Sequence, residues 1–302
     1  MQSNYHIPVL YNEAIEALNI NPSGIYVDCT FGGGGHSNGI LEKLNADGKL
    51  IAFDQDTDAQ KNLLQDERVV FVPHNFRYIQ RFLRLYKIEK VDGVLADLGV
   101  SSHQFDEGSR GFSIRFDGPL DMRMNVHQPL TAKQIVETYT AQQLQLMFQE
   151  FGQVTNAKTL ATHIAINRNN VELETITQFK TFISSLVKGN PNKYLAQVFQ
   201  ALRIEVNDEV GSLKEMLQQL PNILKEGGRA VIITFHSLED RIVKCFFKNG
   251  AFEIEQDLNP FSTDVKEKIF KSISKKPIEA SDEELKKNNR SRSAKLRVVE
   301  RL

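Results

Sequence analysis

The stretch that most constrains the fold is Gly24-Ile-Tyr-Val-Asp-Cys-Thr-Phe-Gly-Gly-Gly-Gly-His-Ser37, where an apolar segment runs directly into four consecutive glycines. Residues 25–27 are β-branched or aromatic and predict a buried strand, and a helix is expected from about Ser37 to Leu44. Glycine has no Cβ, so this turn can bring backbone N–H groups close to a ligand, and the helix N-terminus behind it adds a partial positive charge. The pattern predicts a cofactor-binding turn; a glycine turn with a purely structural role is the alternative.

The turn does not match the fingerprint of dinucleotide-binding proteins. That fingerprint, G-x-G-x-x-G/A, needs a small residue at its third fixed position, which here is Ser37 or Asn38. Asp28, at the end of the preceding strand, is instead typical of folds that bind S-adenosylmethionine (AdoMet). A nucleotide-dependent oxidoreductase is therefore disfavoured.

Three more strands are expected, at residues 49–53, 69–72 and 91–96, and polar segments with helical patterns separate them. Strands that alternate with helices predict a doubly wound parallel sheet, in which ligands bind beyond the carboxyl ends of the strands. Four polar positions follow strand ends in this way: Asp28, Asp54, Asn75–Phe76 and Asp97. Asp54 lies about twenty residues beyond the glycines, the spacing at which an acidic side chain accepts hydrogen bonds from a ribose diol. A solvated loop aspartate is the alternative for Asp54.

The loop at residues 110–124 is rich in Gly and Pro and alternates cationic with aromatic side chains. Guanidinium groups that hold phosphates and phenyl rings that stack on bases suit a single-stranded nucleic acid. A loop folded onto its own aromatic residues is an equally good interpretation. The RNA-binding candidates in this loop are Arg110, Phe112, Arg115, Phe116 and Arg123.

Residues 130–204 show no β-alternation, but possible capping boxes recur at Thr131, Thr140 and Thr175. We therefore expect an α/β fold in which a Rossmann-like class I AdoMet-dependent methyltransferase sheet carries an inserted all-helical subdomain. The expected domains are residues 1–128 and 206–302 for the methyltransferase and residues 129–205 for a helical subdomain that recognises the substrate.

The last third of the chain is expected to contribute a fifth strand at 230–234, a helix at 238–248 capped by Ser237, and a strand at 252–255. Residues 257–289 are polar and Lys-rich and are expected to be mobile. A final strand at 296–299 would close the sheet in antiparallel fashion. The dense basic cluster before it indicates a phosphate contact. Its members are Arg290, Arg292, Lys295 and Arg297.

Composition restricts the partners and the compartment. The 302-residue chain has a formal net charge of −1, so a nucleic-acid partner must be held by a local patch. Cys29 and Cys245 lie far apart in apolar stretches and in no metal-ligand spacing, so we expect buried free thiols and no metal. The N-terminus lacks a basic region followed by an apolar one, and no run could span a bilayer, so a cytoplasmic protein is expected.

The sequence as a whole resembles the bacterial small-subunit ribosomal RNA (cytosine-N4)-methyltransferases, the MraW family. The resemblance covers nearly the whole chain in order and begins with His6-Ile-Pro-Val-Leu10. Two segments depart from the family pattern: residues 192–198, and Asn289, where proline is expected. Both lie outside the glycine turn and bear on RNA contacts. The motifs that carry the resemblance are residues 28–37, 97–102, 118–124, 199–204, 235–241 and 290–297.

The resemblance implies AdoMet as methyl donor and a decoding-centre cytosine of small-subunit (16S) rRNA as acceptor, met in the ribosomal subunit. An RNA-associated ribosome assembly factor that binds AdoMet without essential methyl transfer is the alternative, and a homodimer formed through the helical subdomain is possible. Matched position by position, the cofactor contacts of the family fall on Gly34, Gly35, His36, Asp54, Phe76, Asp97 and Gln104.

Methylation of an exocyclic amine requires a group that accepts a proton during or after methyl transfer. Asp97, at the exit of the fourth strand, is the best-placed candidate for this catalytic role. His236, at the exit of the fifth strand, is the weaker candidate, since a capping or core role suits it equally well. His36 is expected to fix the glycine turn rather than to move protons.

Overall fold

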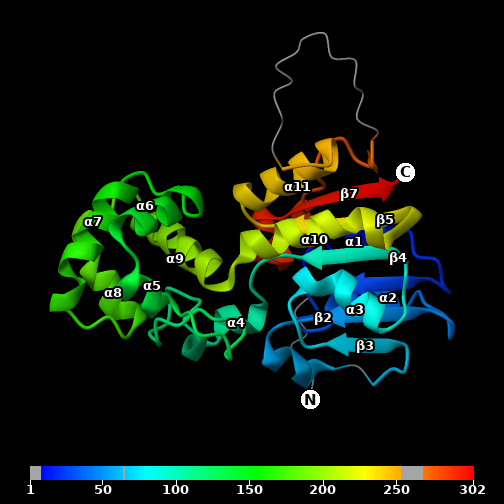
Figure 1. Ribbon diagram of the computed structural model, residues 1–302, viewed down its shortest axis with the longest axis horizontal. Helices are drawn as coiled ribbons and strands as arrows, with labels where there is room; N and C mark the ends of the chain where they lie inside the picture. Colours follow the sequence, from blue (N-terminus) through cyan, green and yellow to red (C-terminus); the bar gives the residue numbers. More distant parts are fainter. Residues whose placement is uncertain (1–7, 64, 253–267) are drawn as a thin grey trace, which may run out of the picture. The chain divides into compact units, whose positions relative to one another are not determined.

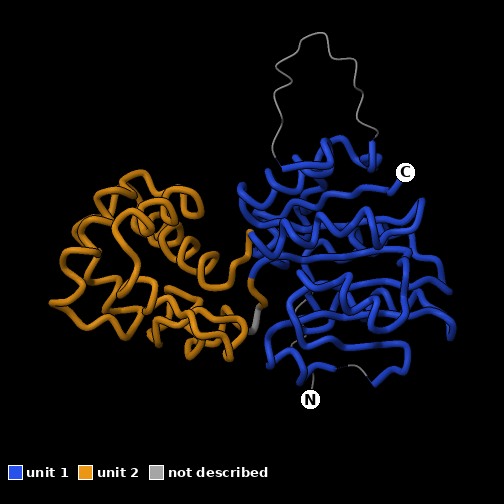
Figure 2. Tube along the Cα trace, in the orientation of Figure 1, with its two compact units in different colours: residues 1–99, 211–302 blue, residues 100–210 orange. Residues whose placement is uncertain are grey.

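The computed structural model describes residues 8–63, 65–252 and 268–302. The chain forms two compact units, which Figure 2 colours separately. The first, here called the sheet unit, comprises Met1–Gly99 and Gly211–Leu302. The second, the helical unit, comprises Val100–Val210. The loop at 110–124 therefore lies within the helical unit rather than within the first methyltransferase segment expected from the sequence.

The sheet unit is built on seven strands in the order β3-β2-β1-β4-β5-β7-β6 (Figure 1). The pairs β1–β2, β1–β4, β2–β3 and β4–β5 are parallel, and β7 is antiparallel to both β5 and β6. The predicted doubly wound sheet and its late antiparallel strand are both confirmed. The strands are β1 Ile25–Asp28, β2 Lys49–Phe53, β3 Val69–Val72, β4 Val91–Asp97, β5 Leu224–Thr234, β6 Phe270–Ser272 and β7 Lys295–Arg301.

Helices cover both faces of this sheet because right-handed crossovers to one edge and then to the other place them on opposite sides. Helices α1 (Tyr11–Leu18) and α2 (Gly35–Leu41) share one apolar cluster with sheet residues such as Tyr26, Leu95 and Val231. Helices α3 (Ile79–Leu85), α10 (Glu209–Ile223) and α11 (Ser237–Asn249) lie along the other side (Figure 1). On that side the ring of Phe53 in β2 packs edge-on against Phe82 of α3, with 5.9 Å between ring centroids.

The shorter elements of the sheet unit follow strand ends or precede the last strand. They are the 3₁₀ helices η1 (Thr57–Asn62), η2 (Phe76–Tyr78) and η6 (Asn289–Ser293), and helix α12 (Asp282–Lys287). The segment at 57–67 was expected to be helical, and in its described part a short 3₁₀ helix forms at Thr57–Asn62. Its cap is Asp56, which accepts a hydrogen bond from the N–H of Asp58.

The helical unit has a core of its own, formed by apolar side chains such as Phe148, Phe179 and Leu202. All three predicted capping boxes are confirmed, at Thr131, Thr140 and Thr175. Its helices are α4 Ser102–Asp106, η3 Gly108–Arg110, α5 Ala132–Thr138, α6 Ala141–Glu150, α7 Ala157–Asn167, η4 Arg168–Asn170, α8 Ile176–Phe182, η5 Ser184–Leu186 and α9 Pro191–Asn207.

Two expectations for the C-terminal third are corrected by the structure. Helix α11 is capped by His236 rather than by Ser237, which is its first residue. The predicted mobility of residues 257–289 is wrong for the described part, 268–289, which holds β6 and α12. Most of the strand expected at 252–255 lies outside the described residues. Among those residues no helix is both long and apolar enough to cross a membrane.

Candidate cofactor and active site

The ends of β1 and β4 are joined by a hydroxyl that the sequence did not single out. Asp28 is fully buried and accepts hydrogen bonds from Ser37 Oγ at 2.7 Å and from the N–H of Thr30 at 3.0 Å. The Oγ1 atom of Thr30 in turn accepts a hydrogen bond from the N–H of Asp97 at 2.7 Å. Polar residues next to strand ends are the signal that could have pointed to Thr30 and Ser37.

Asp54 holds the glycine turn in place. Its Oδ2 atom accepts a hydrogen bond from the N–H of Gly32, and its Oδ1 atom accepts one from the N–H of Asp56, both at 2.8 Å. Gly34 has a φ of 76°, which is the left-handed region that favours glycine, and it caps α2. At Gly33 an added Cβ would meet nothing within 4 Å, so the turn leaves its backbone open to a ligand at that point.

His36 lies behind the turn and links it to Asp97. Its Nε2 atom is 3.1 Å from the carbonyl oxygen of Val9, and its Nδ1 atom is 3.7 Å from Asp97 Oδ2. A carbonyl can only accept, so Nε2 carries the proton and Nδ1 is bare in the neutral ring. Burial lowers the pKa of His36, which favours this neutral form. The ring is therefore bound to the N-terminal segment through Val9.

The N-terminal segment is itself held by the C-terminal part of the chain. Glu284 in α12 accepts a hydrogen bond from the N–H of Leu10 at 2.8 Å and another from Ser291 Oγ. A Cβ added at Gly35 would lie 2.3 Å from Pro8 Cγ, so this segment packs directly on the start of α2. Leu10 and Glu284, which are 274 residues apart in the sequence, thus meet beside the turn.

Glu284→Ala is expected to remove the hydrogen bond that holds the N-terminal segment at Leu10, and to weaken AdoMet binding. A hydrogen bond to a charged group is worth about 1.5–3 kcal/mol, so exchange of the Leu10 amide proton should speed up at least about tenfold. Hydrogen exchange and calorimetry would measure the two effects. Glu283→Ala, which changes an exposed neighbour, is the matched control. An unchanged Leu10 amide in the Glu284 variant would contradict the prediction.

Three carboxyl groups give this edge of the sheet an unusual electrostatic character. Burial raises the pKa of Asp28, raises that of Asp54 to about 6, and raises that of Asp97 well above its ordinary value. The negative charge of Asp28 adds to the effect at Asp54 and at Asp97. Among the described residues no Lys or Arg forms an ion pair with any of the three. Such a site repels phosphates and favours a cation, and AdoMet carries a sulfonium and an ammonium group.

Asp97 has one oxygen that nothing in the described structure satisfies. Its side chain keeps 23% of its surface exposed, yet Oδ1 is buried and has no hydrogen-bond partner among the described residues. A buried acceptor without a donor costs free energy of folding, and such an acceptor is therefore a candidate for binding a ligand or taking part in a reaction. Asp97 is therefore poised to accept a hydrogen bond from a bound molecule.

The other predicted contacts are distributed between the two units. Phe76 begins η2, directly after Asn75, whose Nδ2 atom donates to Gln55 Oε1 at 3.0 Å and to Ser212 Oγ at 3.1 Å. This places Phe76 at the end of β3 on the sheet unit, as predicted. Gln104 belongs to the helical unit, where its Oε1 atom accepts a hydrogen bond from the N–H of Ser101 at 3.0 Å.

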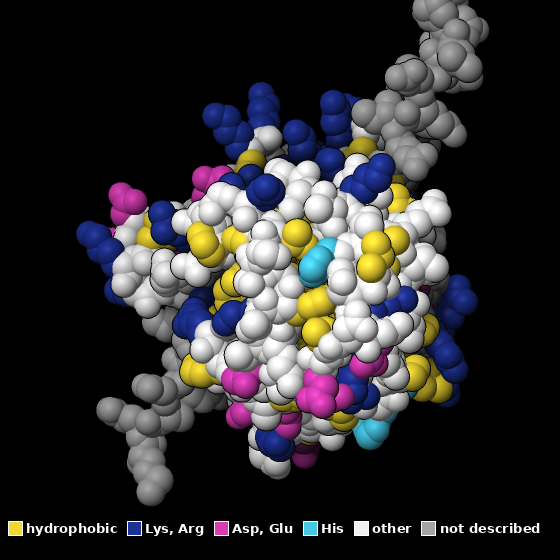
Figure 3. Space-filling view, turned by 90° about the vertical axis from the view of Figure 1, so that its left-hand side faces the viewer, with side chains coloured by type: hydrophobic (Ala, Val, Ile, Leu, Met, Phe, Trp, Pro, Cys, Tyr) yellow, Lys and Arg dark blue, Asp and Glu magenta, His cyan; other side chains and the backbone are white. Residues whose placement is uncertain are grey.

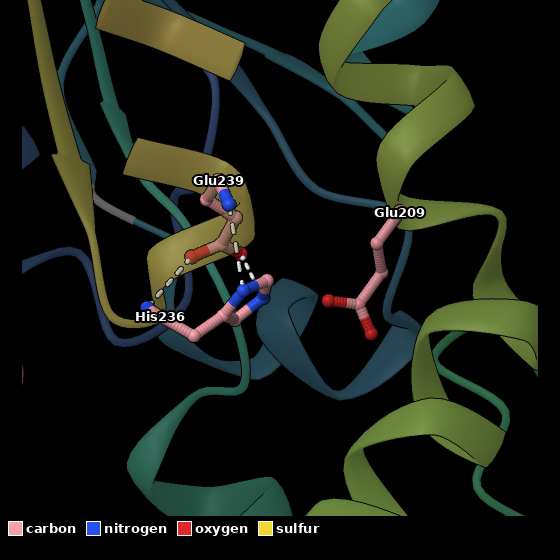
Figure 4. Close-up of side chains that lie close together, drawn as sticks. All are labelled: Glu209, His236 and Glu239. Atoms are coloured by element: carbon pink, nitrogen blue, oxygen red, sulfur yellow. Dashed lines mark hydrogen bonds and ion pairs between the residues drawn. The ribbon is translucent and has the colours of Figure 1, made fainter. Parts of the chain in front are cut away.

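His236 is engaged in capping helix α11 (Figure 4). Its Nδ1 atom accepts from the N–H of Glu239 at 3.4 Å, and its Nε2 atom is 3.0 Å from Glu239 Oε1. Figure 4 also draws Glu209, which belongs to the helical unit and forms an ion pair there with Arg203. The capping role weighed for His236 is the one that the structure displays.

In the loop at 110–124, most candidate RNA contacts are bound to the protein itself. Arg110 donates to the carbonyls of Arg123 and Met124 at 3.0 and 3.1 Å, and Arg123 pairs with Asp121 at 2.8 Å. Phe112 is buried in the core of the helical unit. Arg115, which lies over the ring of Phe105, and Phe116, which is 47% exposed, are the members of the set that remain exposed.

The basic cluster at residues 290–297, which spans η6 and the start of β7, also has some members bound to the protein itself and one that is exposed. Arg297 forms two hydrogen bonds with Asp240, at 2.7 and 3.1 Å, and Lys295 Nζ is 3.9 Å from the same carboxylate. Arg290 and Arg292 lie in η6, and Arg292 is exposed. Of the four, Arg292 is the residue whose charge is most open to solvent.

The helical unit is not basic as a whole. Residues 100–210 contain 10 Lys and Arg and 11 Asp and Glu. Figure 3 shows Lys and Arg side chains spread among hydrophobic and uncharged ones, without one large basic patch on the face in view. Single cations of this unit, rather than its net charge, would have to contact a nucleic acid.

The fold and the site together define a class of protein. A seven-stranded sheet with an antiparallel seventh strand, a glycine turn after β1 and acidic residues at the ends of β1, β2 and β4 is the arrangement of class I AdoMet-dependent methyltransferases. The model of the MraW methylase family matches residues 3–302, and the chain belongs to this family. It is therefore a methyltransferase, and its family uses AdoMet as methyl donor.

Curated relatives agree with this assignment over the full length. The chain is 51% identical to the ribosomal RNA small subunit methyltransferase H of Parabacteroides distasonis, over 99% of this chain and 98% of that protein. It is 50% identical to the protein of the same name from Christiangramia forsetii, with the same coverage. Among solved structures, an rRNA methylase from Streptococcus thermophilus is similar over 97% of this chain and 93% of that one, with 12% identity and a TM-score of 0.41.

Proposed function

We propose that this protein transfers the methyl group of AdoMet to the exocyclic N4 of a decoding-centre cytosine in small-subunit (16S) rRNA. Membership of the MraW methylase family and relatives named ribosomal RNA small subunit methyltransferase H support an rRNA substrate. The choice of cytosine N4 rests on the resemblance carried by the motifs of the sequence, which include residues 97–102 and 235–241.

The residues that would hold AdoMet fit its chemistry. Gly34, Gly35 and His36 form the turn and the start of α2, and Asp54 would accept hydrogen bonds from the ribose hydroxyls with the lone pairs that Gly32 and Asp56 leave free. The carboxyl groups of Asp28, Asp54 and Asp97 suit a cationic ligand. Phe76 and Gln104 complete the set by correspondence with the family. AdoMet would supply an electrophilic methyl group bound to a sulfonium.

The observation that carries the proposed chemistry is the unpartnered Oδ1 of Asp97. The N4 amine of cytosine is a weak nucleophile, because its lone pair is delocalised into the ring. A carboxylate that accepts a hydrogen bond from the amine orients its lone pair toward the methyl group and then accepts the proton that the methylated nitrogen must lose. In this scheme the nitrogen would gain the methyl group as the bond from that group to sulfur breaks, and the sulfonium charge would be lost with the leaving thioether. Asp97 would gain the proton that the nitrogen releases, so atoms and charge balance.

The neighbours of Asp97 prepare it for this role. The bare Nδ1 of His36 faces the other carboxylate oxygen at 3.7 Å, so the pair has a second place at which a proton can be held. The raised pKa favours the neutral acid when no cation is near, and the sulfonium of bound AdoMet would favour the ionised form. Once ionised, the Asp97 carboxylate is a better proton acceptor than an exposed aspartate. The target base must leave its stack to be reached, and exposed Phe116 is a candidate for holding it.

Transfer of labelled methyl from AdoMet to rRNA tests the proposal. Purified protein would be incubated with small ribosomal subunits or with naked 16S rRNA from cells lacking the gene, and the RNA digested to nucleosides for mass analysis. We expect one N4-methylcytidine per RNA. Label on a different nucleoside would contradict the assignment of the acceptor. AdoMet binding with no transfer to either RNA would favour an assembly factor instead.

A further inference from the structure

The side of the sheet unit covered by α3, α10 and α11 carries cations that have no acidic partner in the part of the chain that the structure describes. On and just after α3 these are Arg81, Arg84, Lys87 and Lys90, all exposed. None of the four forms an ion pair or a side-chain hydrogen bond within the described residues. This distinguishes them from Arg110, Arg123 and Arg297, whose charges are compensated.

A second row of exposed cations lies on α11, at Arg241, Lys244 and Lys248. Their spacing of three and four residues places them on one face of the helix, opposite the buried face that contains Val243 and Phe246. These cations also lack ion pairs within the described residues. Two helices of the same side of the sheet therefore present unpaired positive charge.

Contacts through α10 connect the two rows. Gln219 accepts a hydrogen bond from the N–H of Gln80 at 3.0 Å and donates to the carbonyl of Arg77 at 2.7 Å, which fixes α10 beside α3. Toward α11, Lys214 of α10 lies over the ring of Phe252, and this ring stacks on Phe246. The three helices therefore lie side by side, with α10 between the two rows of cations.

Among the described residues, acidic side chains on this side are few or already paired. Glu215 pairs with Arg77, Asp240 pairs with Arg297, and Glu239 is buried. In the described part of these helices and of the turn after α3, this leaves Glu89 as the exposed carboxylate without an ion pair. The formal net charge of the whole chain is −1, so positive charge is concentrated here rather than distributed evenly.

The surface also contains a depression and an exposed aromatic ring. A depression of about 390 Å³ between α3 and α10 is lined by the cations Arg84 and Lys87, the carboxamides of Gln80 and Asn222, and one carboxylate, Glu89. Lys87 has a φ of 58°, a left-handed conformation that is strained for lysine. Close by in the sequence, Tyr86 is 40% exposed. Cations, amide donors and an exposed ring are the groups that bind a phosphate backbone and stack on unpaired bases.

We propose that this surface, defined by Arg81, Arg84, Lys87, Lys90, Arg241, Lys244 and Lys248, docks the phosphate backbone of small-subunit rRNA away from the methylated base. The inference rests on the proposed function and adds a second anchoring site to it. The surface would supply affinity and register, whereas the carboxyl edge of the sheet performs the chemistry.

Charge reversal tests this docking surface. The variant Arg84→Glu/Lys87→Glu is compared with Lys43→Glu/Lys49→Glu, which changes the charge equally at exposed positions outside the surface. At about 150 mM salt we expect the first variant to raise the KM for 16S rRNA at least about tenfold, with kcat and AdoMet affinity unchanged. The slope of log affinity against log salt should become shallower by about 0.7–0.9 for each lost phosphate contact. The control should match the wild type.

Other outcomes overturn the proposal. One is that both variants bind 16S rRNA with the affinity and salt slope of the wild type. Another is that affinity is lost for assembled subunits but not for naked rRNA, which would assign the surface to a ribosomal protein. Filter binding measures the affinity of the protein for rRNA independently of methyl transfer. A protein that binds through this surface but does not methylate rRNA would therefore refute the proposed function and leave the docking surface standing.

Discussion

Asp97→Asn is expected to lower kcat for rRNA methylation by about 100- to 10,000-fold, the range over which a positioned acid or base contributes to a reaction. Asparagine preserves the shape of the side chain and can still accept a hydrogen bond, but it cannot take up the proton released by the methylated amine. AdoMet affinity should change far less, by no more than about tenfold. Single-turnover transfer of labelled methyl and calorimetry with AdoMet would measure the two quantities separately.

The same variant should be more stable than the wild type, and increasingly so as the pH rises. The pKa of Asp97 lies well above 3.8 in the folded protein, so between these two values the native state holds a proton that the unfolded chain releases. Stability of the wild type therefore falls with rising pH through this window, and asparagine removes the effect. Thermal unfolding between pH 5 and pH 8 should show a growing difference in Tm in favour of the variant.

The matched control is Asp92→Asn, since Asp92 lies on the same strand and its carboxylate pairs with Lys225 Nζ at 2.7 Å. That variant should lose stability and keep its kcat. If Asp97→Asn turned over at the wild-type rate with AdoMet bound, Asp97 would be a cofactor contact and no more. If the Tm difference were the same at every pH, its buried carboxyl would not be the cause.

The sequence was most informative where local chemistry and strand order act together. The glycines after Asp28, and the polar residues after each strand, predicted the edge at which Asp54 and Asp97 are now found. Thr-x-x-Gln capping boxes were equally predictable, because both of their hydrogen bonds form within four residues. Parallel strands then bring distant chain segments to one edge without any further information from the sequence.

Contacts between distant segments could not be predicted in this way. The hydrogen bond from Leu10 to Glu284 and the pairing of Arg297 with Asp240 depend on the tertiary fold. The dense run of cations at residues 290–297 indicated phosphate binding, yet pairing with Asp240 occupies two of its four members. The unpaired cations of α3 could not be recognised as a candidate site from the sequence, because exposure and lack of partners are properties of the folded chain.

Asp54→Ala is expected to weaken AdoMet binding at least about 100-fold. The substitution removes the acceptor for the N–H groups of Gly32 and Asp56, and with it the proposed acceptor for the ribose hydroxyls. Hydrogen bonds to a charged acceptor are worth about 1.5–3 kcal/mol each, and about 1.4 kcal/mol is a factor of ten in affinity. Calorimetry with AdoMet would measure the loss, and Asp58→Ala, in the neighbouring 3₁₀ helix η1, should leave the affinity close to that of the wild type.

A double-mutant cycle separates the ribose contact from the support of the turn. S-adenosylhomocysteine and its 2′,3′-dideoxy analogue would each be titrated into the wild type and into Asp54→Ala. If Asp54 contacts the ribose, removing the hydroxyls should cost the wild type about 100-fold and the variant much less, because the partner is already gone. Equal losses in both proteins would show that Asp54 acts only through Gly32 and the shape of the turn, and would remove it from the set of residues that touch the cofactor.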